Sequence, residues 1–120
     1  MTQLTDKERQ DFIDAWRTIA RVAQTNSANK GFWKDGQSRN KGEMIALMHS
    51  ELSEALEAVR KPNKPDDHIP NESALGLELA DTIIRIMDFD HGFNLDVGRL
   101  VLCKMDYNSG RPAMHGGKAF

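Results

Sequence analysis

The chain has 120 residues, a formal net charge of −2 and an isoelectric point near 6.1, with 39% hydrophobic and 28% charged residues. This length corresponds to about one domain with a modest core, and the nearly balanced charge argues against a protein that coats a nucleic acid polymer or an acidic membrane. A single cysteine excludes an intrachain disulfide framework. We therefore expect one domain over 1–120.

The N-terminal segment and the length of the apolar runs give an expectation about the location of the protein in the cell. The N-terminus lacks the basic and apolar regions of a secretory leader, and no later run reaches the length needed to span a membrane. From these patterns we expect a cytoplasmic protein with no membrane partner.

The first predicted element is a helix over roughly 5–25. Thr5 and Glu8 have the spacing of a capping box, and apolar residues then recur at helical intervals. The period disappears over 26–40, where small, polar and charged residues predominate. This segment is predicted as a loop.

The second and third predicted helices are separated by prolines. The second helix begins after a cap at Asn40 and ends before Pro62. Residues 61–70 contain three prolines and are predicted as a stiff connection. The third helix is predicted from about Glu72 to a stop at Gly92.

The fourth predicted helix begins at a cap formed by Asn94 and ends near Asn108, and residues 109–120 are predicted as an irregular tail. No segment shows the alternating period of a strand. The predicted fold class is therefore all-α, a short four-helix bundle.

Two acidic pairs are the most informative pattern in the chain. Glu51 and Glu54 lie three residues apart in the second predicted helix, and Glu78 and Asp81 lie three apart in the third. Residues at this spacing share a helix face, so antiparallel helices would gather four carboxylates that repel one another. Hard divalent cations prefer such oxygen ligands. We expect all four residues to bind Mg²⁺, with Mn²⁺ as a possible substitute.

Two simpler interpretations of these pairs involve no metal. Acidic residues at this spacing often form only a solvated helix face, and Arg85 or a lysine could neutralise them without a metal. A di-iron bundle is a third possibility, but it needs Glu-x-x-His on two helices. The sequence offers only Asp88-x-x-His91.

The predicted loop carries a candidate nucleotide contact. Phe32 and Trp33 lie between lysines, with Lys34 directly after them, an arrangement that suits a stacked base with phosphates nearby. The alternative is that one of these aromatic residues anchors the loop to the core. We expect Trp33 to contact the base and Lys34 the phosphates.

The fourth predicted helix and the start of the tail carry further candidate phosphate contacts. Lys104 and Asn108 are four residues apart and share a helix face, and Arg111 follows closely. These groups could donate charged hydrogen bonds to a polyphosphate. The alternative is a solvated helix end.

Together these residues resemble the MazG-like family of all-α nucleoside triphosphate pyrophosphohydrolases. The family's mark, Glu-x-x-Glu followed after a variable gap by Glu-x-x-Asp, is matched by the two acidic pairs. The resemblance covers roughly 30–120, including the aromatic loop and the tail segment 115–118. The chain departs from many members in having Ser50 in place of a further glutamate, which removes one possible metal contact.

The resemblance implies Mg²⁺-dependent cleavage of a ribo- or deoxynucleoside triphosphate to the monophosphate and pyrophosphate. It also implies a homodimer or a tetramer built from dimers. Glu51 or Glu54 is expected to serve as the general base. The competing functional hypothesis is a non-enzymatic helical dimerisation or interaction module whose acidic strips bind a basic partner.

Overall fold

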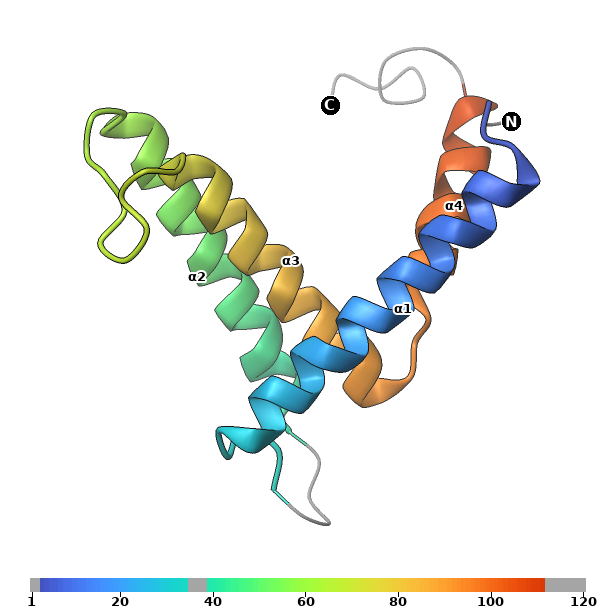
Figure 1. The fold of residues 1–120 in the computed structure, drawn as a ribbon, viewed down its shortest axis with the longest axis horizontal. Coiled ribbons are helices and arrows are strands. Elements are labelled where there is room, and N and C mark those ends of the chain that lie inside the picture. The colour runs from blue at the N-terminus through green and yellow to red at the C-terminus, as the bar shows by residue number, and fades with distance from the viewer. Residues whose placement is uncertain (1–2, 35–38, 112–120) are drawn as a thin grey trace.

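A computed structural model describes residues 3–34 and 39–111. Within these ranges the chain forms four α-helices and no strand, which confirms the all-α prediction (Figure 1). The helices are α1 (Asp6–Asn29), α2 (Lys41–Arg60), α3 (Ala74–Phe93) and α4 (Val97–Ser109). None of them is both long enough and apolar enough to cross a membrane.

The predicted caps of α1 and α2 are present. The Glu8 amide donates to the Thr5 hydroxyl over 3.1 Å, and the Thr5 amide donates to the Glu8 carboxylate over 3.0 Å. The Asn40 side chain accepts from the Glu43 amide over 2.8 Å at the start of α2. These bonds satisfy amide groups that have no partner within the helix.

Two predicted helix boundaries shift. Helix α1 continues to Asn29, beyond the predicted end near residue 25, and the chain then turns at Gly31, whose φ is +89°. Helix α3 begins at Ala74 rather than near Glu72, because the Ser73 hydroxyl accepts from an amide of the first turn. The end of α1 was placed too early because the residues after 25 are mostly polar and show no apolar period, although they continue the helix.

The prediction that Asn94 caps α4 is wrong. Asn94 instead terminates α3 in the left-handed conformation, with φ 56° and ψ 50°, a role for which asparagine is well suited. The N-cap of α4 is Asp96, whose side chain makes no capping hydrogen bond. Its carboxylate is bound to Arg17 and Arg99 instead.

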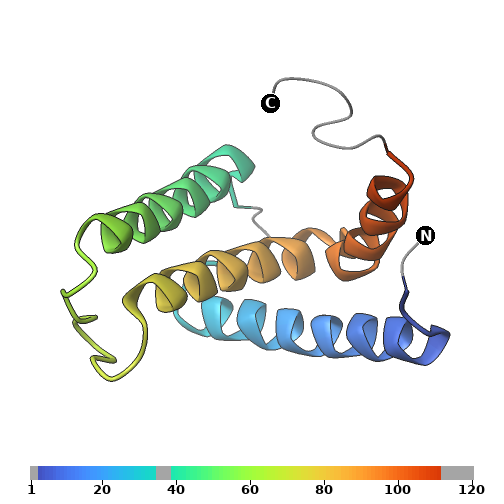
Figure 2. The ribbon, with the colours of Figure 1, turned by 90° about the horizontal axis from the view of Figure 1, so that it is seen from above.

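The four helices form an open V rather than a closed bundle. Helices α2 and α3 run antiparallel along one arm, α1 crosses the C-terminal half of α3, and α4 packs against α1 on the other arm (Figures 1 and 2). The radius of gyration is 16.9 Å, whereas a compact chain of this length has about 14 Å. The predicted four-helix bundle is therefore not closed within a single chain.

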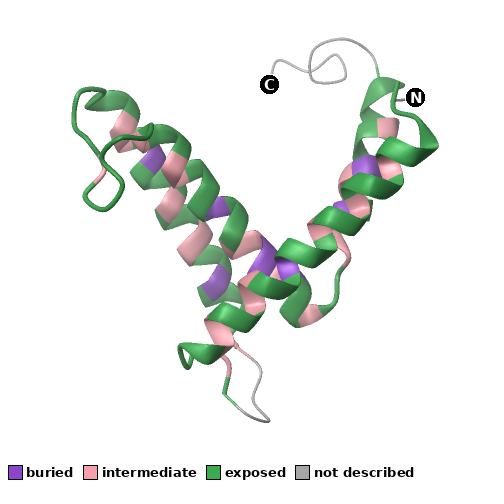
Figure 3. Cartoon of the chain, in the orientation of Figure 1, coloured by how far each residue is buried: buried purple, intermediate pink, exposed green. Residues whose placement is uncertain are grey.

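The apolar core of the described residues is small (Figure 3). Many large apolar side chains of α2 and α3 remain exposed. Two aspartates of α3, in contrast, are almost fully buried: Asp88 is 9% and Asp90 is 4% exposed. Burial of a carboxylate is costly unless it is hydrogen-bonded, so both side chains need partners. The buried apolar residues are Ala20, Met44, Ala55, Met87 and Leu102.

Candidate metal centre

The antiparallel pairing of α2 and α3 brings together three of the four predicted ligands. Glu51 of α2 and both Glu78 and Asp81 of α3 each place one carboxylate oxygen within 4.8 Å of the other two. Ligand oxygens around a Mg²⁺ ion are separated by about 3–4 Å, given its octahedral geometry and short bonds. Small side-chain rotations would bring these three oxygens to that separation, so the donor set fits a hard divalent cation.

The electrostatics of this three-carboxylate cluster favour a cation. Burial raises the pKa of Glu78, and a hydrogen bond with Glu51 and the charges of Asp81, Glu51 and Glu54 raise it further. Burial and the Glu51 charge likewise raise the pKa of Asp81, although the nearby Arg85 opposes this shift. Like charges held together resist full ionisation. A bound cation would relieve that repulsion.

Arg85 supplies part of the compensating charge. Its Nε donates to Glu51 Oε1 over 3.0 Å across the α2–α3 contact. The arginine pairing considered from the sequence is therefore realised for Glu51. One guanidinium does not balance three carboxylates, and Glu78 and Asp81 retain raised pKa values beside it.

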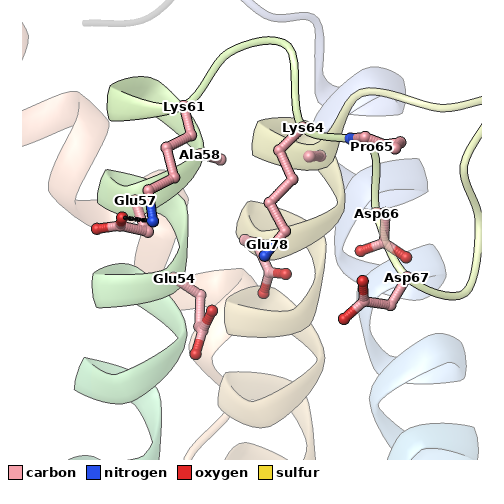
Figure 4. Close-up of a pocket in the computed structure, with 10 residues that line it drawn as sticks. Glu54, Glu57, Ala58, Lys61, Lys64, Pro65, Asp66, Asp67 and Glu78 are labelled. Carbon is pink, nitrogen blue, oxygen red and sulfur yellow. Dashed lines mark ion pairs between the residues drawn. The ribbon is translucent and has the colours of Figure 1, made fainter.

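Glu54, the fourth predicted ligand, lies outside the cluster. It is exposed and shares with Glu78 a small pocket of about 100 Å³ between the end of α2 and the start of α3 (Figure 4). Its charge still contributes to the raised pKa of Glu78. Glu78 thus belongs to the three-carboxylate cluster and also shares a pocket with Glu54. The pocket also contains Lys61 and Lys64.

A larger groove opens beside the cluster, with a volume of about 490 Å³. We call it the loop groove, because the last turns of α1 and the following loop form one wall and α2 and α3 form the other. The groove combines acidic, cationic and aromatic groups, the combination expected of a metal-dependent nucleotide site. Its main polar and aromatic lining residues are Asn26, Lys30, Phe32, Arg39, Glu51, Asp81, Arg85 and Asp88.

Trp33 does not present its ring to the loop groove. Its indole Nε1 donates to Asp88 Oδ1 over 2.7 Å, and its ring packs edge-on against Phe93 at 5.4 Å between centroids. The structure thus realises the alternative in which this residue anchors the loop. Phe32 is 58% exposed and lines the groove, so it is the loop aromatic available to a ligand.

The predicted phosphate contacts are not gathered beside the carboxylates. Lys34 is exposed on the loop, and α4 lies on the other arm of the V (Figure 1). On α4 and just after it, Lys104 and Arg111 instead approach the ring of Tyr107, at 5.1 and 5.7 Å from its centroid. Asn108 is exposed on the same helix. The tail segment 115–118 lies outside the described residues.

Sequence reasoning missed Arg39 as a groove residue. Its guanidinium donates to the buried Asp88 over 3.0 Å and lies 5.3 Å from the centroid of the Phe32 ring. Arg39 directly precedes the predicted cap of α2, and no periodicity connects it with α3. Asp88 is buried, so its carboxylate needs a partner, but this burial is apparent only in the structure.

Comparisons of the chain with protein-family models, curated proteins and solved structures found no match.

The raised pKa values give a prediction for stability. An acid whose pKa is raised by folding contributes most to stability below its ordinary pKa of about 4, and this contribution is lost as pH rises through the raised value. The stability that the three-carboxylate cluster contributes to the metal-free protein should therefore fall as the pH rises above about 4. Glu78→Gln should reduce this loss and raise the melting temperature at pH 7 by a few degrees.

Thermal denaturation followed by circular dichroism in EDTA, from pH 4.5 to 7.5, measures this effect. Mg²⁺ should stabilise the wild type and not Glu78→Gln, because the variant lacks a ligand. Glu72→Gln is the matched control, because Glu72 is an exposed glutamate just before α3 and does not belong to the cluster. A Glu78→Gln protein with the wild-type pH dependence would contradict the description of the cluster.

Proposed function

We propose that the protein is a Mg²⁺-dependent hydrolase that converts a nucleoside triphosphate, most suitably a deoxynucleotide, to the monophosphate and pyrophosphate. The observation that carries this proposal is the convergence of Glu51, Glu78 and Asp81, of which Glu51 and Asp81 also line the loop groove. The match of the acidic pairs to the MazG-like pattern supports the same function.

The three-carboxylate cluster is the proposed metal site. When bound there, Mg²⁺, or Mn²⁺ in its place, would neutralise phosphate charge and make a water molecule more acidic. Glu54 lies one turn from Glu51 on the exposed face of α2, so it could complete the ligand set or accept a proton.

The residues of the loop groove supply the remaining requirements of the reaction. Lys30 and Arg39 can hold phosphate oxygens, since guanidinium and ammonium groups make strong charged hydrogen bonds with them. Phe32 offers an exposed ring for stacking of a base.

In the proposed reaction, the oxygen of water bonds to the α-phosphorus of the triphosphate. The bond between the α-phosphorus and the oxygen that bridges to the β-phosphorus breaks, and pyrophosphate leaves with the electron pair of that bond. A carboxylate, Glu54 or Glu51, takes the proton from the water. Of the two, Glu54 is the more exposed, and Glu51 is already hydrogen-bonded to Arg85.

The proposal includes self-association as a homodimer or a tetramer of dimers. On α2 the exposed residues Leu52, Leu56 and Val59 form one stripe, and on α3 Leu75, Leu79 and Ile83 form another. Contiguous apolar surface of this kind usually marks an interface. A second copy that packs on the α2–α3 arm would complete a four-helix bundle.

Self-association would also give α4 a place in the site. Lys104, Asn108 and Arg111 lie on the opposite arm from the carboxylates of the same chain. They can reach the triphosphate only if a second copy brings its α4 to the cluster. We therefore assign the α4 contacts to a neighbouring subunit.

The alternative function is an interaction module without catalysis. Two observations favour it specifically: the exposed apolar stripes of α2 and α3, and the direct pairing of Glu51 with Arg85. This alternative requires no metal and no turnover. The same assay therefore separates the two functions.

The test is pyrophosphate release from a panel of ribo- and deoxynucleoside triphosphates, with Mg²⁺ and with EDTA. We expect release by the wild type with Mg²⁺, none with EDTA, and none by Glu54→Ala. Circular dichroism of the variant should show intact helices. If the wild type releases no pyrophosphate from any triphosphate in the panel, that result would instead support the interaction module.

A further inference from the structure

The loop between α1 and α2 is tied to α3 at a single buried carboxylate, Asp88. One of its oxygens accepts the Trp33 indole N–H over 2.7 Å, and the other accepts from the Arg39 guanidinium over 3.0 Å. Trp33 and Arg39 lie on either side of residues 35–38, so Asp88 binds the loop at two points. Both partners are charged or strongly polar, which makes these bonds among the stronger ones available.

The surroundings of this carboxylate reinforce the attachment. The Arg39 guanidinium lies 5.3 Å from the ring centroid of Phe32 and 5.4 Å from that of Trp33, within the range of cation–π attraction. The Trp33 ring rests directly on Gly92, where a side chain of any size would overlap it. The loop therefore has one well-defined seat on α3.

Asp88 also lines the loop groove, together with Asp81, Arg85 and the loop residue Phe32. Asp81 and Asp88 are seven residues apart and so share a face of α3. The carboxylate that seats the loop is thus two turns from one proposed metal ligand. Its contacts fix where Phe32 lies relative to the cluster.

We infer that Asp88 is a positioning residue for substrate binding: through Trp33 and Arg39 it holds Phe32 and the cations of the loop over the carboxylate cluster. The inference rests on the proposed function, because it concerns the nucleotide bound in that groove. Asp88 contacts neither metal nor phosphate in this account. Its effect is on the affinity for the triphosphate and not on the chemical step.

Three variants separate the parts of this attachment. Asp88→Asn keeps an acceptor for Trp33 and removes the charge opposite Arg39, whereas Asp88→Ala removes both bonds. Gly92→Ala leaves Asp88 in place and displaces the Trp33 ring. Asp88→Asn and Gly92→Ala should each raise KM for the triphosphate about tenfold, the size expected for loss of one charged hydrogen bond. Asp88→Ala should raise KM further, and kcat should change much less in all three variants. Mg²⁺ binding by the cluster should be unchanged.

A spectroscopic measurement reports loop release independently of activity. The chain has two tryptophans, Trp16 and Trp33, so 5-fluorotryptophan labelling gives two ¹⁹F resonances, which Trp33→Phe assigns. Asp88→Ala and Gly92→Ala should shift the Trp33 resonance and leave that of Trp16, whose indole donates to Asp90 over 2.7 Å. Arg17→Gln breaks the exposed Arg17–Asp96 pair on the other arm and serves as a control for general destabilisation.

The outcomes distinguish this inference from the proposed function. A shifted Trp33 resonance with raised KM and retained Mg²⁺ binding supports the positioning role. A shifted resonance with the wild-type KM overturns it and leaves the proposed function standing. An inactive wild type overturns both. If Asp88→Ala does not fold, Gly92→Ala and Asp88→Asn give the same comparison.

Discussion

Asp81→Asn is expected to lower Mg²⁺-dependent pyrophosphate release by about 100-fold or more, because a lost charged ligand removes several kcal/mol of charge stabilisation from the reaction. The substitution keeps the size of the side chain and removes its charge. Because the pKa of Asp81 is raised by burial and by the Glu51 charge, the neutral residue should not destabilise the helices. Circular dichroism and steady-state assays of the purified variant measure both properties.

The matched control for this prediction is Asp14→Asn, which removes an exposed carboxylate from α1. It should retain wild-type turnover and wild-type Mg²⁺ dependence. Asp81→Asn with activity close to that of the wild type would show that the three-carboxylate cluster is not the metal site.

Leu56→Glu is expected to convert the associated protein to a monomer and to abolish most of its turnover. Leu56 is 52% exposed in the single chain and lies in the apolar stripe of α2. A charge buried at an interface without a partner is strongly unfavourable. Loss of association should also lower turnover, because Lys104 and Arg111 of a second copy would no longer reach the carboxylates. Light scattering after size exclusion gives the mass, and pyrophosphate release gives the activity.

Ala46→Glu provides the control for this second prediction. Ala46 is exposed on the same helix and is not three, four or seven residues from Leu52, Leu56 or Val59, so the variant should associate and react as the wild type does. A wild-type protein that is monomeric and fully active would refute the proposed role of the second copy.

Much of the local structure could be predicted from the sequence, because capping and periodicity are local signals. The caps at Thr5 and Asn40 and the helical character of all four elements were of this kind. Asn94 was assigned to the wrong helix because one asparagine suits both the end of a helix and the start of the next. The left-handed backbone conformation of Asn94 shows that this residue ends α3.

The site was predictable only where two residues share a helix face. The spacing of Glu78 and Asp81 located them correctly beside each other, and antiparallel helices brought Glu51 to them. The seat of the loop on Asp88 was not predictable, because it joins residues 49 and 55 positions apart in the chain. The prediction that Trp33 contacts the base has a separate cause, because spacing along the chain does not show which of two adjacent rings is buried.

The open arrangement of the helices also lay beyond the sequence. Apolar periodicity shows which face of a helix avoids water, but not whether the same chain or a second copy covers it. The apolar stripes of α2 and α3 are exposed in the single chain, and their sequence pattern does not show what covers them.

The most direct test of the central claim is ³¹P NMR of a deoxynucleoside triphosphate incubated with the wild-type protein and Mg²⁺. We expect the three triphosphate signals to be replaced by those of a monophosphate and pyrophosphate, and we expect EDTA to prevent the change. Formation of a diphosphate and inorganic phosphate, or no change with any triphosphate in the panel, would contradict this expectation.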